Sequence, residues 1–364
     1  PPRVVAQVVL QDVPGTQSRT QRDALAVAAS NAGRTHTEPD CVGPNYAEMM
    51  ARYLGPIITQ AFADSDVTEI YVNPQDCHIR FDTHSRGKID SGNVVAPERL
   101  EMFLNAVASA QGTMLGPTAP TIQAELPTDV FGGARLQGFV PPATQGVALV
   151  IRKRPTRVYP LDSYVDCGML SSSWRDALGQ AVANRQTIVI AGGTGTGKST
   201  LLGALLHEIS SRCPDDRLVV LEDTVELRCP AGDHLALRTT PELSLAALVK
   251  ATLRASPTRI VIGEVRDHAA LDFLDAAVTG HPGGLCTVHA SSAMGALHRL
   301  DRLAQRANVP AQARLVAEAI DLVVVLAGDH RTRRVTDLVR ITGLSNDGQF
   351  TLQHCTESGT WNTL

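Results

Sequence analysis

One stretch decides the fold of this chain: Gly192-Gly193-Thr194-Gly195-Thr196-Gly197-Lys198-Ser199, followed by Thr200. It fits the pattern GxxxxGK[ST] and stands between a predicted strand, Thr187–Ala191, and a predicted helix, Lys198–Ser210. The glycines let backbone N–H groups turn toward phosphate oxygens, and the positive end of the helix dipole favours an anion. Lys198 is expected to reach the β- and γ-phosphates of a nucleotide, while the Ser199 hydroxyl binds Mg²⁺.

The residues that follow alternate between short apolar runs and helical patterns. Strands and helices are predicted in turn at Leu218–Glu222, Leu245–Arg254, Ile260–Glu264, Ala269–Thr279 and Leu285–His289. Continuous apolar strands separated by helices indicate a parallel sheet that is covered on both faces. An α/β domain is therefore predicted over residues 170–345, with a C-terminal tail at 346–364.

The residues before the stretch mix helices and strands in another way. Helical spacing at Tyr46–Ala63 is interrupted by Gly55-Pro56, and a second helix is predicted at Leu100–Gln111. Strands are predicted at Thr68–Asn73, Cys77–Asp82, Val130–Phe139 and Val147–Lys153. This predicts a smaller α+β domain over residues 45–154, joined through a linker at 155–169 and preceded by an extension, in part mobile, at 1–44.

Composition restricts the classes of function. The 364 residues carry a net charge of −4, which disfavours a protein that holds nucleic acid by charge alone. The seven cysteines include no CxxC pair, which argues against a zinc ribbon and for a reducing compartment. The longest apolar runs, such as Leu322–Ala327, are too short to cross a membrane. These features predict a cytoplasmic protein whose membrane association, if any, is peripheral.

Several strand ends carry groups suited to nucleotide hydrolysis. The chain has no Asn-Lys-x-Asp motif, so ATP is favoured over GTP, and it has Gly263 where the second nucleotide motif usually has Asp. Metal binding must then use Ser199, water and another acidic strand end, for which Glu222 and Asp223 are candidates. Carboxylates at this edge of a parallel sheet lie beside the phosphate crevice. Each could instead be a solvated strand end.

Two of these groups are assigned catalytic roles. Glu264 is the leading candidate for the catalytic carboxylate, with Glu222 as the alternative that orients water. His289 ends an apolar strand and is expected to donate a hydrogen bond to the γ-phosphate, although a lone histidine is often structural. Glu226 and His281 are weaker candidates.

Taken together, these segments resemble the secretion-superfamily ATPases, which power type II and type IV secretion, pilus dynamics and conjugation. The resemblance runs through the phosphate loop, an Asp box, an atypical second nucleotide motif and a His box. Their residues here are Gly192–Ser199, then Arg217–Asp223 with Glu226, then Gly263-Glu264-Val265-Arg266-Asp267, and finally Thr279–His281 with Thr287–Ala290. The N-terminal segments Thr68–Pro74, Gly133–Gly138 and Ile151–Lys153 are also similar to that family.

The resemblance implies a C-terminal RecA-like phosphate-loop domain and a smaller α+β N-terminal domain, with ATP held between them. It also implies catalytic roles for Glu264, Arg266 and His289, with Arg135 and Arg152 supplied to the nucleotide by the N-terminal domain. A homo-hexamer is expected at the inner membrane, with components of the transport apparatus and a coupling ATPase as partners. Length and the missing tetracysteine motif are most similar to the conjugal-transfer TrbB type.

Other readings remain open. A pilus retraction or assembly ATPase has the same motifs. A regulatory nucleotide switch would not need both Glu264 and His289, and a DNA-translocating motor is disfavoured by the acidic charge.

Overall fold

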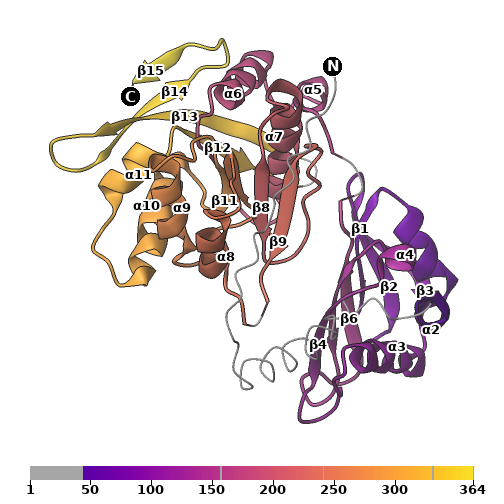
Figure 1. Cartoon of the computed structure of the whole chain (residues 1–364). Coiled ribbons are helices and arrows are strands. Elements are labelled where there is room, and N and C mark those ends of the chain that lie inside the picture. Colours follow the sequence, from indigo (N-terminus) through magenta and orange to yellow (C-terminus); the bar gives the residue numbers. More distant parts are fainter. Residues whose placement is uncertain (1–43, 156–157, 241, 330–331, 364) are drawn as a thin grey trace, which may run out of the picture.

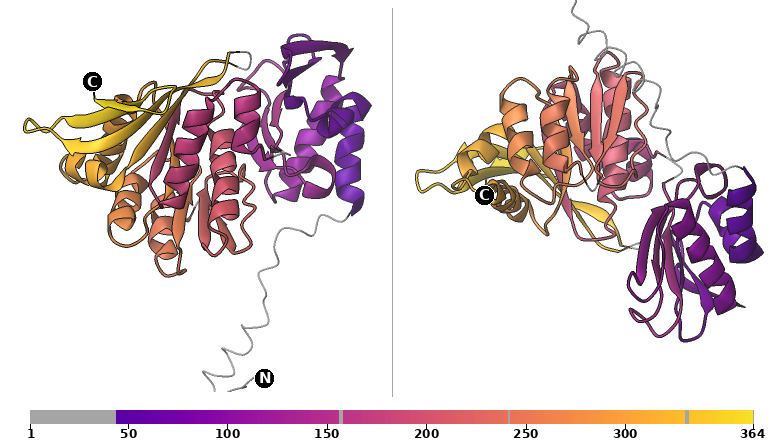
Figure 2. Two further views of the ribbon diagram at one scale, coloured as in Figure 1. Left: turned by 90° about the horizontal axis from the view of Figure 1, so that it is seen from above. Right: turned by 60° about the horizontal axis from the view of Figure 1, so that its bottom comes forward.

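Two β-sheets organise the chain in the computed structural model, which describes residues 44–155, 158–240, 242–329 and 332–363. Each sheet carries its own helices, and the two bodies lie side by side, joined by a short connection (Figure 1, Figure 2). Nearly all of the predicted extension 1–44 falls outside the described residues. Among the described helices, none has the length and apolar character needed to cross a bilayer.

The N-terminal sheet has six antiparallel strands in the order β3-β2-β1-β6-β5-β4. Its strands are β1 Val67–Val72, β2 His78–Thr83, β3 Gly87–Val94, β4 Thr121–Glu125, β5 Arg135–Phe139 and β6 Ala148–Arg152. Helices α2 (Pro44–Ala63), α3 (Pro97–Ala110) and α4 (Thr128–Phe131) cover one face and bury an aliphatic core (Figure 1). Because side chains alternate along a strand, the opposite face is left to polar residues.

The structure differs from the predicted N-terminal elements in two places and confirms them in a third. Residues 128–131 form α4 rather than the start of a strand, because the left-handed Gly132 (φ 62°) ends the helix just before β5. Strands β3 and β4 were not foreseen, since their patterns are largely polar and exposed. The predicted interruption at Gly55-Pro56 is confirmed, because helix α2 is kinked at Gly55, whose φ of 80° is not helical.

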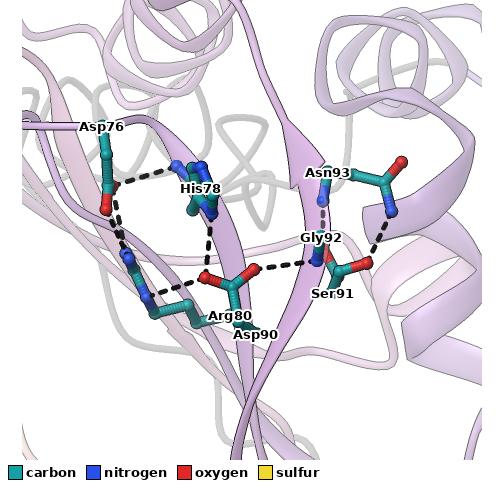
Figure 3. A network of polar contacts seen from close by, with 7 residues as sticks. All are labelled: Asp76, His78, Arg80, Asp90, Ser91, Gly92 and Asn93. Carbon is teal, nitrogen blue, oxygen red and sulfur yellow. Dashed lines mark hydrogen bonds and ion pairs between the residues drawn. The ribbon is translucent and has the colours of Figure 1, made fainter.

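An exposed polar network joins side chains of the hairpin of β2 and β3 to the turn that precedes it (Figure 3). His78 Nδ1 lies 2.8 Å from Asp90 Oδ2, and Arg80 binds Asp76 and lies 3.5 Å from the same Asp90 oxygen. The hydrogen bond from Arg80 holds the pKa of Asp76 below its ordinary value. The N–H of Gly92 does the same for Asp90, followed by the hydrogen bond with His78. We call these four side chains the hairpin network.

The C-terminal sheet has nine strands in the order β15-β14-β13-β12-β7-β11-β10-β8-β9. The six strands from β12 to β9 are parallel to one another, and β13, β14 and β15 continue the sheet in antiparallel fashion. Their bounds are β7 Ile188–Gly192, β8 Leu218–Glu222, β9 His234–Arg238, β10 Arg259–Ile262, β11 Leu285–His289, β12 Leu322–Ala327, β13 Arg334–Leu344, β14 Phe350–Cys355 and β15 Trp361–Thr363.

Helices cover both faces of this sheet and bury a separate core on each. One face carries α5 (Leu161–Asp166), α6 (Ser172–Ala183) and α7 (Lys198–Arg212). The other carries α8 (Leu245–Thr252), α9 (Ala269–Val278), α10 (Ala293–Ala304) and α11 (Ala313–Ala319) (Figure 1). The predicted α/β class, with a parallel sheet in one domain and a smaller α+β domain, is confirmed.

The described residues of two segments predicted as a linker and a tail include helices and strands of the C-terminal body. Within 155–169, Leu161 and Tyr164 of α5 are buried in the core, because Pro160 begins a helix there rather than extending a linker. Within 346–364, β14 and β15 lengthen the sheet. The indole of Trp174 on α6 donates to the carbonyl oxygens of Cys355 and Thr356 and fixes them to the body.

Candidate nucleotide site

The phosphate loop lies between the end of β7 and the start of α7, as the motif predicts. Thr196 Oγ1 donates to the Gly193 carbonyl at 3.0 Å, and Lys198 Nζ donates to the same oxygen at 2.8 Å. Gly195 and Gly197 have φ values of 75° and 94°, which only glycine adopts without strain. The loop is thus already curled in the way that an anion site requires.

The ammonium of Lys198 is buried in the loop and surrounded by charges. Its pKa lies below the ordinary value, first because of burial and further because of the positive charges of Arg266 and Arg152; Glu264 opposes the shift. Since Arg152 belongs to β6, the N-terminal domain already acts electrostatically on the phosphate loop. A bound polyphosphate would supply the negative charge that this lysine lacks.

A second polar group forms where β10 and β11 end beside the loop. Glu264 Oε1 lies 3.1 Å from His289 Nε2, and Glu264 Oε2 accepts from Arg266 at 2.7 Å. Arg266 NH1 lies 3.6 Å from Asp223 Oδ2, beyond the end of β8. We call these four side chains the loop-side cluster. The structure therefore brings together three predicted catalytic residues from adjacent strand ends.

Protonation within this cluster is set by its charges. Burial would raise the pKa of Glu264, but the hydrogen bond and charge of Arg266, with His289 and Lys198, bring it below its ordinary value. Burial, followed by the charge of Lys198, lowers the pKa of His289. At neutral pH the site therefore presents an ionised carboxylate beside a neutral imidazole, the combination suited to orienting water and sensing a phosphate.

Glu222 is placed differently from its predicted role. It is buried, with 5% of its surface exposed, and its Oε1 accepts from the backbone N–H groups of Glu226 (2.9 Å) and Leu227 (3.0 Å). Burial raises its pKa to about 7. A Cβ at Gly263 would lie 3.1 Å from Glu222 Cγ, so this side chain fills the room beside the position where Asp is usual.

The predicted metal residues are not gathered at one point. Ser199 Oγ donates to Glu226 Oε2 at 3.2 Å, whereas Asp223 pairs with Arg266 and Glu222 binds backbone. No group of three His, Cys, Asp or Glu residues suited to a metal ion occurs in the part of the chain that the structure describes. Ser199 and Glu226 nevertheless offer the oxygen donors that Mg²⁺ prefers.

Arg135 and Arg152 belong to one cross-strand row of the N-terminal sheet. The row runs Glu69–Arg152–Arg135–Glu125 through direct register partners on β1, β6, β5 and β4. Their neighbours along each strand are buried under the helices, so this row occupies the uncovered face. Arg152 Nε lies 3.7 Å from Glu69, and with the Gln123 amide in its hydrogen-bonding orientation, turned over from the orientation in the structure, Arg135 Nε donates to the amide oxygen at 3.0 Å.

Sequence reasoning missed a contact between the two bodies. Glu125 on β4 binds Arg154 of the connection at 2.6 Å and Arg238 at the end of β9 at 3.2 Å. No motif marks these arginines. His281, a weaker candidate, lies elsewhere, with its Nδ1 3.0 Å from the Pro257 carbonyl oxygen.

A parallel sheet with a phosphate loop between its central strand and helix, and acidic and histidine side chains at the neighbouring strand ends, defines a RecA-like phosphate-loop protein. Comparison with known protein families agrees with this class and narrows it to one family. The chain belongs to the family of type II/IV secretion system proteins, which matches residues 48–358.

Individual relatives support the same placement. The chain is 38% identical over 304 residues to a conjugal transfer protein TrbB of Rhizobium radiobacter, covering 84% of this chain and 93% of that protein. It is 35% identical over 318 residues to the type IV secretion system protein PtlH of Bordetella pertussis, covering 77% and 91%. The Legionella pneumophila ATPase DotB shares the fold, with a TM-score of 0.54 and 19% identity over 87% and 82% of the two chains. The predicted resemblance to this superfamily, and to the TrbB type within it, is confirmed.

Proposed function

We propose that this chain binds and hydrolyses ATP and thereby drives a type IV secretion or conjugal transfer apparatus. The contact that carries the proposal is the bridge from His289 to Glu264 beside the buried Lys198. It places a neutral hydrogen-bond donor, an ionised carboxylate and a phosphate-binding lysine at one sheet edge. A phosphate-binding lysine and a residue that orients the attacking water are recurring parts of phosphoryl-transfer sites.

Each residue has a distinct role in this proposal. Lys198 and the loop N–H groups bind the β- and γ-phosphates, and Glu264 orients the attacking water. His289 senses the γ-phosphate, while Arg266 keeps Glu264 ionised and in place. Mg²⁺, when bound, would neutralise phosphate charge; Ser199 would hold it, with Glu226 alongside rather than Glu222 or Asp223.

The N-terminal domain completes the site from its uncovered face. Arg152 is the better placed arginine, because its charge already acts on Lys198, and Arg135 lies beside it in the same row. Pro155 and Val158 of the connection line a small hollow together with Ser199 and Thr200, so the connection borders the phosphate loop. Closure of the two bodies on the nucleotide would then convert hydrolysis into movement.

The assembly belongs to the proposal as well. We infer a homo-hexamer at the inner face of the membrane, working with inner-membrane components of the apparatus and a coupling ATPase. The support is the family membership and the conjugal transfer and secretion relatives.

The first test is ATP turnover by the full chain, measured alone, with DNA and with phospholipid vesicles. Lys198→Ala should abolish turnover while the thermal unfolding midpoint stays close to that of the parent. Lys88→Ala, on the exposed strand β3, is the matched control and should leave turnover unchanged. Substantial hydrolysis by the Lys198 variant would remove the phosphate loop from the mechanism.

A further inference from the structure

Arg333 contacts the phosphate loop although it lies 135 residues beyond Lys198 in the sequence. It comes just before β13, in the connection from β12, the neighbour of β7 on the side opposite β11. Its NH2 group donates to the carbonyl oxygen of Gly195 at 2.7 Å. Because β13 runs antiparallel to β12, the chain turns back after β12 and brings the positively charged Arg333 to the phosphate loop.

The side chain also packs across the loop. A Cβ at Gly197 would lie 3.0 Å from Arg333 Cδ and 3.3 Å from its Nε and NH1. Arg333 thus occupies the space that a side chain at position 197 would need. The last glycine of the motif is required by its φ of 94°, and a side chain at this position would in addition have to displace Arg333 by a few tenths of an ångström.

The Arg333 guanidinium donates a hydrogen bond to the loop, but not all of its nitrogens have partners among the described residues. Its Nε is buried and has no hydrogen-bond partner among the described residues. After burial, the charge of Arg333 is the next cause that lowers the pKa of His84, in the turn between β2 and β3 of the N-terminal domain. The charge also opposes the raised pKa of Tyr164 on α5. Arg333 therefore stands where the loop, α5 and the N-terminal domain approach one another.

We propose that Arg333 is a positioning residue of the nucleotide site, which clamps Gly195 and Gly197 so that the loop N–H groups face the phosphates. The inference rests on the proposed nucleotide binding. A surface arginine without this role would not lie flat over the one loop glycine that borders Lys198. Because the clamp acts on the loop rather than on the transferred phosphoryl group, it should affect binding of ATP and ADP equally.

The expected effect separates binding from chemistry. Arg333→Ala should weaken ADP and ATP binding by about tenfold, the scale of one hydrogen bond to a charged group, and raise KM by a similar factor. Its kcat should change by less than about threefold, since Glu264 and His289 are untouched. Arg333→Lys keeps the charge and one donor but loses the planar fork, so it should recover part of the affinity.

The measurement is a titration of the full chain with a fluorescent ADP analogue, with inorganic pyrophosphate as competitor, alongside steady-state kinetics. Arg334→Ala, the adjacent exposed arginine on β13, is the matched control and should bind like the parent. Pyrophosphate affinity should fall with ADP affinity in the Arg333 variants. Equal binding by the Ala variants of 333 and 334 would overturn the proposal, as would a loss of kcat with binding intact.

The same experiments distinguish a failure of the proposed ATP hydrolysis from a failure of the Arg333 proposal. If the parent chain binds ADP and pyrophosphate but turns over no ATP, hydrolysis is rejected, while the titrations still decide the role of Arg333. If Arg333→Ala unfolds at a lower temperature, Arg333→Lys carries the test: an ADP affinity below that of the parent, with a parental kcat and unfolding midpoint, supports the clamp, and parental affinity overturns it.

Discussion

The hairpin network and the loop-side cluster have the same composition, two carboxylates, one histidine and one arginine, yet they differ in origin. The hairpin network, Asp76, His78, Arg80 and Asp90, comes from two adjacent strands and the turn before them, within fifteen residues of sequence (Figure 3). The loop-side cluster comes from three strand ends that are far apart in the chain. Composition alone therefore does not make a site.

The two groups of side chains also differ in their surroundings, and this decides which of them can act as a site. The hairpin network faces water, where ion pairs contribute little and are screened by salt. The loop-side cluster lies at the carboxyl edge of a parallel sheet, beside a buried lysine and a curled loop, where charges interact more strongly. The first should matter for local stability and the second for turnover. Matched substitutions in both groups test this contrast.

After the loss of Lys198, the largest effect on turnover should come from the arginines of the N-terminal domain, a part that the hairpin network lacks. Arg152→Ala should lower kcat by about 10³-fold, the lower end of what such arginines contribute in phosphoryl transfer. Arg135→Ala should cost less, because its guanidinium is held by Gln123. Arg80→Ala in the hairpin network is the control and should leave kcat unchanged. Parental turnover by both row variants would exclude the N-terminal domain from the catalytic step.

The next effect should come from the carboxylate at the centre of the cluster. Glu264→Gln should keep ATP binding and lower kcat by about 10²-fold, the scale of a lost water-orienting group. Asp90→Asn, the central carboxylate of the hairpin network, should leave kcat within twofold. Binding and turnover that fall together would instead mark Glu264 as a metal ligand.

A smaller effect is expected at the histidines. His289→Ala should lower turnover by about tenfold with ATP affinity nearly unchanged, because its hydrogen bond assists the γ-phosphate step without holding the nucleotide. His78→Ala should have no effect on either quantity. Both can be measured by steady-state kinetics and nucleotide titration, together with DNA transfer by cells that carry each variant. Wild-type kinetics for the His289 variant would make it a structural residue.

The smallest expected effect is on thermal stability, and it has opposite signs for substitutions of Glu222 and of Asp90. Burial raises the pKa of Glu222 to about 7, above its ordinary 4.5, so its unfavourable charge lowers stability as pH rises between these values. Glu222→Gln should therefore raise the unfolding midpoint by a few degrees at pH 8 and not at pH 4.5. The pKa of Asp90 is lowered from 3.8, so its stabilisation is present above that pH and lost below it. Thermal melts of Glu222→Gln and Asp90→Asn at both pH values should shift in opposite directions at pH 8.

Local pattern was sufficient for the elements that carry the chemistry. The strands Leu218–Glu222 and Leu285–His289 have the predicted bounds, because buried parallel strands are continuous apolar runs. The phosphate loop follows from the glycine and lysine spacing, since backbone φ and helix dipole are local properties. Polar edge strands such as β3 and β4 carry no comparable signal, and a short apolar run cannot distinguish α4 from a strand.

The phosphate loop, the parallel sheet around it and the acidic and histidine strand ends beside it could all be predicted from the chain of amino acids. The partners of the side chains could not: Glu264 pairs with His289 and Arg266, Glu222 is turned toward the backbone of Glu226, and Arg333 contacts the loop from a distant segment. The reason is physical. Strand and loop propensities depend on neighbours in the chain, whereas side-chain partners depend on strand order and on which face of each sheet remains uncovered.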